Sequence, residues 1–133
     1  MGTVKVIGEY LALVSGAMVL INCLIVADSL FRFYGNLSLS RIWLFNWIIN
    51  LLLATIVLIC SKIEFTVKKA RGALIVNIGL CWIIFAILNT ASMAFLIIFP
   101  YSLFNYYLFS IPYITIEGLL CHIGGILILA SSE

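Results

Sequence analysis

Apolar residues fill this chain in four long blocks, and polar residues gather in the short stretches between the blocks. The blocks predict helices at about 6–30, 41–60, 73–99 and 113–130, and Pro100 stops the third of them. A helix needs about 20 mostly apolar residues to cross the hydrocarbon core of a bilayer. We therefore predict an all-α fold, in which residues 1–133 form one bundle of four transmembrane helices.

The composition favours the same class of protein. Of the 133 residues, 65% are hydrophobic and 9% are charged, whereas soluble domains carry about 25% charged residues. A soluble fold of this size leaves too much of its surface in water to hide so many apolar side chains. The net charge of +2 is too small to predict nucleic acid as a partner.

Small and amide residues recur at a spacing of four along three of the predicted helices. These positions are Gly8, Ala12 and Gly16 in 6–30, Asn46 and Asn50 in 41–60, and Ala86 and Thr90 in 73–99. Small residues let the backbone of another helix approach closely, and an amide in hydrocarbon needs a hydrogen-bond partner. We predict that these positions pack against other helices. The alternative for the glycine stripe is chance recurrence in an apolar helix.

The stretch Ser61–Gly72, called the hinge below, joins the second and third predicted helices. It holds four of the seven Lys and Arg residues: Lys62, Lys68, Lys69 and Arg71. Four spans would place both termini and the hinge on one side of the membrane, and positive residues favour the inner side. We expect both termini to be inside, and the four hinge residues to contact anionic headgroups.

Two ionisable residues, Glu117 and His122, lie inside the fourth predicted helix. An ionisable group is costly in hydrocarbon, so each is a candidate for function. The alternative for both is a structural role, as a helix cap or a hydrogen bond between helices. The segments Ile116–Leu120 and Ile123–Leu127 resemble the carboxylate helix of rotary-ATPase proteolipids. That resemblance implies an ion or a proton carried by Glu117.

The sequence contains no local motif of an enzyme, a metal site or a cofactor site. The four cysteines form no Cys-x-x-Cys pair, and a single His excludes a haem held by two His of this chain. Neither a glycine-rich phosphate loop nor a Ser/His/Asp arrangement is present. We predict a non-catalytic protein without cofactors, and we expect phospholipids to be its bound small molecules.

Three short motifs suggest a family. They are Ile63-Glu64-Phe65 and Arg71-Gly72-Ala73-Leu74 at the hinge, and Leu13-Val14-Ser15-Gly16-Ala17-Met18 in the first helix. In these motifs the chain resembles the small four-helix COPI-associated membrane proteins of the Golgi. The resemblance implies a membrane component of the Golgi or of vesicles. The charge-free aromatic connection Tyr101–Pro112 departs from the pattern of that family.

The function that these patterns favour is packing against other membrane proteins. The chain has almost no mass outside the predicted spans, and it has more packing faces than one thin bundle can bury. Both features are typical of a small accessory subunit of a large energy-transducing complex, and they favour the mitochondrial inner membrane. A COPI-associated Golgi protein and an ion or proton translocator that uses Glu117 are the two alternatives.

Overall fold

The computed structural model describes residues 2–32, 39–64, 66–94, 110–111 and 114–132, and four α-helices account for most of them. The helices are α1 (Gly2–Arg32), α2 (Leu39–Lys62), α3 (Lys68–Ala94) and α4 (Ile116–Ser131). Ahead of α4, the two-residue strands β1 (Ser110–Ile111) and β2 (Ile114–Thr115) pair antiparallel. The predicted all-α fold with four helices is confirmed, and the strand pair adds to it.

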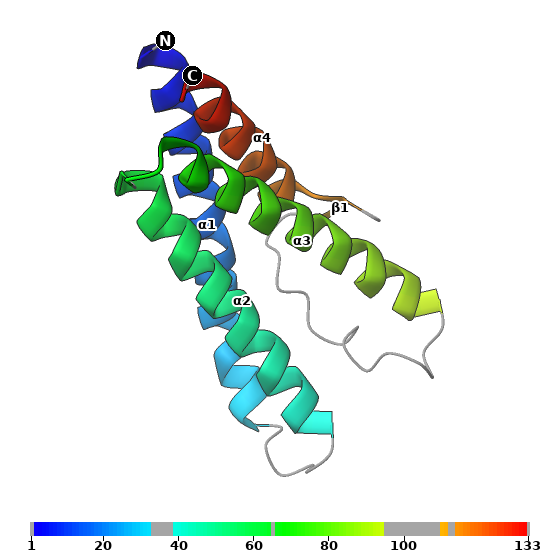
Figure 1. The fold of residues 1–133 in the computed structure, drawn as a ribbon. Helices are drawn as coiled ribbons and strands as arrows, with labels where there is room; N and C mark the ends of the chain where they lie inside the picture. Colours follow the sequence, from blue (N-terminus) through cyan, green and yellow to red (C-terminus); the bar gives the residue numbers. More distant parts are fainter. Residues whose placement is uncertain (1, 33–38, 65, 95–109, 112–113, 133) are drawn as a thin grey trace.

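The long helix α1 packs against both α4 and α2 (Figure 1). Its first half packs against α4, its second half packs against α2, and α4 lies between α1 and α3. The helices α2 and α3 run apart from the hinge and touch each other little. Both termini lie at the end of the molecule where the hinge is (Figure 1).

The helix bounds differ from the predicted ones mainly at the polar ends. Three of the four basic hinge residues, Lys68, Lys69 and Arg71, are part of α3, which begins at Lys68 and not at 73, while Lys62 ends α2. The predicted end of this helix, at 99, lies outside the described residues. Helix α4 begins at Ile116 and not at 113, because Thr115 has an extended backbone (φ −105°, ψ 130°) and belongs to β2.

Each helix turns one face of large apolar side chains outward. These residues include Ile7, Val14, Ile21 and Ile25 on α1, Leu52, Ile56 and Ile59 on α2, Leu74, Leu80 and Ile84 on α3, and Leu119, Ile123 and Ile126 on α4. In a soluble helix the large aliphatic residues occupy the inward stripe, and polar residues face the water. The outward faces of this protein show the opposite arrangement.

The inward faces are rich in small and polar residues. Buried positions include Ala12, Ser15 and Asn22 on α1, Asn50, Ala54 and Ser61 on α2, and Thr115, Glu117 and Cys121 in β2 and α4. Larger apolar residues, among them Ile75, Trp82 and Ile128, fill the spaces between these positions. Small buried side chains bring the helix axes close together, which determines the contacts described next.

One segment of the described residues, Gly2–Ile25 in α1, is a helix long and apolar enough to cross a membrane. The apolar helical stretches Trp47–Lys62 in α2 and Ile116–Ser131 in α4 are shorter, between 10 and 17 residues long. The structure therefore supplies one candidate span, and the crossing by all four helices stays a prediction.

Candidate functional site

Four glycines form a close seam between the antiparallel helices α3 and α4. A Cβ atom on Gly79 would lie 2.5 Å from the backbone nitrogen of His122, and one on Gly125 would lie 2.6 Å from that of Val76. Gly72 opposes the backbone of Leu129 in the same way, and Gly118 opposes Ile83. Glycines of α3 and α4 thus alternate along the seam, each facing a larger residue of the other helix. The two backbones touch because no side chain separates them.

The predicted packing stripe of α1 lies at contacts with two other helices of the chain. A Cβ atom on Gly8 would lie 2.7 Å from the carbonyl oxygen of Gly124 in α4. One on Gly124 would lie 2.9 Å from the backbone nitrogen of Ala12. Two turns further along α1, Gly16 faces Ala54 in α2. The stripe Gly8, Ala12 and Gly16 therefore packs against α4 and α2 of the same chain.

The seam was missed in the sequence because its glycines recur every seven residues and not every four. Gly72 and Gly79 are seven apart on α3, and Gly118 and Gly125 are seven apart on α4. A spacing of seven keeps residues on one side of a helix that packs lengthwise against a partner. A search for glycines at this period in two apolar blocks would have found the seam.

The predicted amide and small-residue faces on α2 and α3 are described only in part. Asn50 is buried, with 1% of its surface exposed. The side chains of Asn46, Ala86 and Thr90 lie outside the described part of the structure. Also on α2, the indole N–H of Trp47 donates a hydrogen bond of 2.8 Å to the carbonyl oxygen of Cys23 in α1. This bond joins α2 to the second half of α1.

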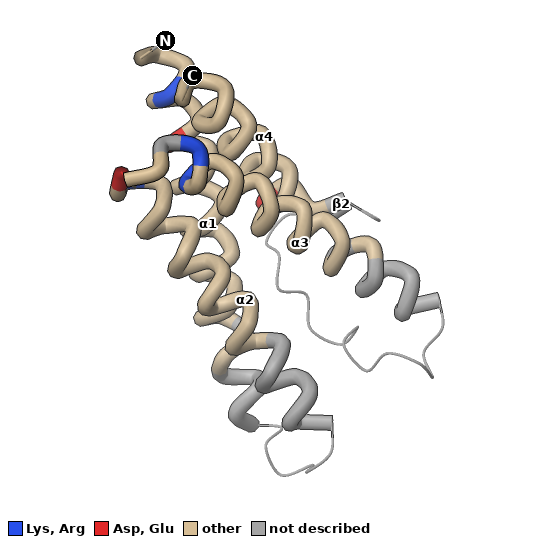
Figure 2. The backbone as a smooth tube through the Cα atoms, viewed as in Figure 1, with Lys and Arg blue, Asp and Glu red and all other residues tan. Residues whose placement is uncertain are grey.

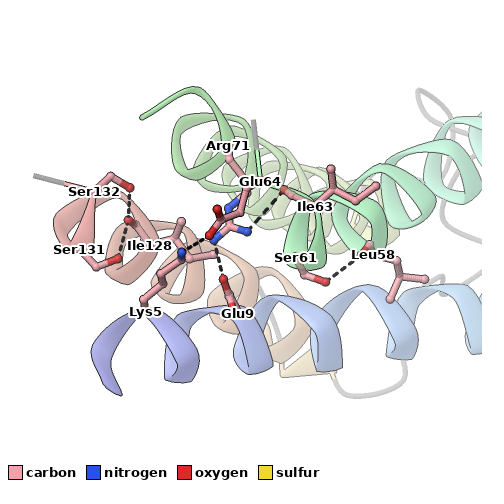
Figure 3. Close-up of polar contacts among 10 residues, drawn as sticks. All are labelled: Lys5, Glu9, Leu58, Ser61, Ile63, Glu64, Arg71, Ile128, Ser131 and Ser132. Carbon is pink, nitrogen blue, oxygen red and sulfur yellow. Dashed lines mark hydrogen bonds and ion pairs between the residues drawn. The ribbon is translucent and has the colours of Figure 1, made fainter. Parts of the chain in front are cut away.

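Two ion pairs connect the hinge to α1 (Figure 3). The guanidinium of Arg71 lies 2.6 Å from the carboxylate of Glu9, and the two side chains are 4% and 18% exposed. A second pair, between Lys5 and Glu64, lies at the surface. Arg71 also donates to the carbonyl oxygen of Ile63, at 3.4 Å. Apart from Glu117 at the start of α4, the charged side chains of the described part gather at this end of the molecule (Figure 2).

The predicted headgroup residues of the hinge occupy different environments. Arg71 is buried against Glu9, so its guanidinium faces α1. The ammonium group of Lys62 lies 4.7 Å from the centre of the Tyr10 ring, a cation–π contact. Lys69 is exposed, and the side chain of Lys68 lies outside the described part. The pattern of charge in the sequence could not reveal the pairing with Glu9, which lies 62 residues away.

Glu117 and His122 make hydrogen bonds to different parts of the fold. Glu117 is fully buried, and it accepts a hydrogen bond of 2.7 Å from the hydroxyl of Thr115. It lies in the first turn of α4, where the helix dipole favours a carboxylate. The ring nitrogen Nδ1 of His122 lies 3.1 Å from the carbonyl oxygen of Val76 in α3. The interaction of His122 therefore joins two helices, and that of Glu117 lies at a helix start.

Among the described residues, no group of three or more His, Cys, Asp or Glu side chains could hold a metal ion. The cysteines are free thiols: Cys23, Cys60 and Cys121 are buried, and Cys81 is exposed. Comparison of the chain with protein-family models, curated proteins and solved structures gives no match. The resemblance at the hinge to COPI-associated proteins therefore stays a prediction from the sequence.

Proposed function

We propose that this chain is a non-catalytic integral membrane protein whose four helices all cross the bilayer, and that it serves as a small accessory subunit of a larger membrane complex. The observation that carries the proposal is the direction of the side chains. Large aliphatic residues such as Ile56, Ile84 and Ile123 face outward on the helices, while Asn50, Ser15 and Glu117 face inward. Soluble monomers rarely expose apolar patches that extend over every face.

Lipid makes this arrangement favourable. Acyl chains can cover outward aliphatic side chains without a free-energy penalty. In water, each Å² of exposed apolar surface is unfavourable by about 25 cal/mol. In lipid, helices associate through close backbone packing and internal polar contacts, because burial of apolar surface gives little advantage there. The glycine seam between α3 and α4 is packing of that kind.

The accessory role is supported by the surfaces that stay exposed after the helices of the chain have packed against each other. The glycine stripe of α1 and Asn50 of α2 are buried inside the chain, so among the described residues the surfaces left for partners are the outward aliphatic faces. These faces extend along all four helices and suit either acyl chains or the apolar helices of neighbouring subunits. We propose an energy-transducing membrane, with the mitochondrial inner membrane favoured, as the location.

The experiment is native electrophoresis of detergent-solubilised membranes, followed by mass spectrometry of the band that contains the chain. Co-migration with a complex much larger than 14.8 kDa supports an accessory subunit. Migration as a free monomer or small oligomer contradicts it. Imaging of the tagged chain separates the locations, because the COPI-associated alternative requires overlap with coat-bearing Golgi membranes and the favoured one requires mitochondria.

A second candidate function is ion or proton translocation, and the burial of Glu117 favours it. Ionisable side chains inside the membrane are rare, and many of them mark ion or proton pathways. The test compares ion and proton flux into liposomes that contain the wild-type chain or Glu117→Gln. Loss of flux in the variant alone supports translocation, and equal flux in both rejects it.

A further inference from the structure

One polar side chain, Asn77, lies on the outward face of α3 among large aliphatic residues. It is exposed, and its neighbours on that face are Leu74, Leu80 and Ile84. Asn77 is nine residues from Lys68, where α3 begins at the charged end of the molecule, or about 14 Å along the helix. The hydrocarbon core is about 30 Å thick, so the membrane placement proposed above puts this amide deep in the core, beyond the reach of headgroups and water.

The amide of Asn77 can make more hydrogen bonds than its own helix provides. Its Nδ2 donates to the carbonyl oxygen of Ala73, at 2.9 Å. An amide has a second N–H and an acceptor oxygen, and the contacts of Asn77 within the described part of the structure use neither. Thr55, an exposed polar residue within α2, differs, because its single hydroxyl proton is donated to the carbonyl oxygen of Leu51, at 2.8 Å. In hydrocarbon, Asn77 therefore needs a partner outside its helix, and Thr55 does not.

The outward positions around Asn77 recur with the spacing of a coiled-coil seam. Steps of three and four residues connect Ala70, Ala73, Asn77, Leu80, Ile84 and Ile87, called the Asn77 face below. All of them are exposed except Ala73, which is half-buried. This spacing is that of the a and d positions of a heptad, and Asn77 takes an a position. A single Asn at an a position favours two parallel helices in register.

We propose that a second copy of the chain packs on the Asn77 face, with the two Asn77 amides hydrogen-bonded to each other across a twofold axis. An amide both donates and accepts, so it complements an identical amide. Copies inserted in one orientation carry α3 parallel and Asn77 at the same depth, so a twofold contact brings the two amides together. The inference rests on the membrane placement proposed above, and a pair of copies is compatible with membership of a larger complex.

The first test locates the contact by oxidative cross-linking of the full chain in phosphatidylcholine liposomes. All variants carry Cys81→Ser, because the native Cys81 is exposed. A cysteine is then introduced at Ile84 on the Asn77 face, or at Ile56 on α2 or Ile123 on α4 as controls. We expect Ile84→Cys to form disulfide-linked dimers, because residues at one a position of a parallel pair lie opposite each other. The two controls should stay largely monomeric; equal cross-linking of all three, or none at Ile84→Cys, overturns the proposal.

The second test measures the contribution of the amide. Energy transfer between copies labelled at a terminus with donor or acceptor dyes, followed as lipid is added, gives the dissociation constant of the dimer. We expect Asn77→Leu to raise this constant roughly tenfold, through the loss of two hydrogen bonds between helices. Thr55→Val removes an outward hydroxyl that is already bonded within its helix, so this matched control should leave the constant unchanged. An unchanged constant for Asn77→Leu overturns the proposal.

Two further outcomes separate this proposal from the function on which it rests. Cross-linking of Ile84→Cys in native membranes to a different protein, and not to a second copy, overturns the second copy as the occupant of the Asn77 face and leaves the accessory role standing. Extraction of the wild-type chain from the liposomes by alkaline carbonate overturns the membrane placement itself.

Discussion

At the scale of single residues, the close approach of α3 and α4 depends on the absence of side chains at Gly79 and its three counterparts. A Cβ atom at Gly79 would lie 2.5 Å from the backbone nitrogen of His122, and backbone cannot give way as a flexible side chain does. We expect Gly79→Ala to lower the free energy of unfolding in detergent micelles by about 1–3 kcal/mol. Circular dichroism recorded during titration with a denaturing detergent measures this free energy of unfolding. Gly2→Ala, with nothing within 4 Å, is the control; equal stability of both variants would refute a close seam.

The buried pair at the hinge gives a second prediction at the same scale. Arg71→Ala leaves the Glu9 carboxylate, 18% exposed, without the guanidinium that lies 2.6 Å away. We expect a loss of about 3 kcal/mol, since breaking a buried pair strands a charge. In a Glu9→Gln background the same substitution should cost clearly less, because no carboxylate is left behind.

The surface pair of the hinge is the natural comparison for that measurement. Lys5→Ala breaks the contact with Glu64, whose side chain is 72% exposed, and it should change the free energy of unfolding by less than about 1 kcal/mol. If Arg71→Ala lowered the free energy of unfolding as little as Lys5→Ala does, the Glu9 carboxylate would not need the guanidinium of Arg71 for stability in the fold.

At the scale of helices, hydrophobic pattern predicted the number and approximate place of the elements, and it predicted their contacts poorly. An apolar block fixes a helix because length and the absence of charge suffice to recognise it. Which helix faces which is decided by side-chain volume at one or two positions per turn. Gly16 turned out to face α2, while Gly8, two turns earlier, faces α4. The burial of Arg71 depends likewise on a distant residue, so charge counting could not reveal it.

The register of the seam gives a prediction about the element α3. One alanine inserted between Val76 and Asn77 rotates everything after it by about 100°. Gly72 and Val76 would still face α4, but Gly79 and Ile83 would turn away from His122 and Gly118. We expect the variant to lose its cooperative unfolding transition and to become sensitive to protease. An alanine inserted between Thr66 and Val67, ahead of α3, should be tolerated; equal sensitivity of the two insertions would contradict the proposed register.

At the scale of the whole molecule, both termini and the hinge share one end (Figure 1), and this end carries most of the positive charge. In the sequence, Lys5, Lys62, Lys68, Lys69 and Arg71 belong to this end, and Arg32 and Arg41 to the other. The pairs with Glu9 and Glu64 do not cancel this asymmetry, because the orientation of membrane helices follows Lys and Arg, and acidic residues contribute little.

The charge asymmetry predicts the orientation of the protein and how to disturb it. Tags on the two termini should both be accessible from the inner side of the membrane, as four crossings require. Replacing Lys62, Lys68 and Lys69 by Gln leaves Lys5 and Arg71 against Arg32 and Arg41, so we expect a mixture of orientations. Replacing Arg32 alone should leave the orientation unchanged. Protease protection of the tags in sealed vesicles measures both variants, and termini found on opposite sides would exclude an even number of crossings.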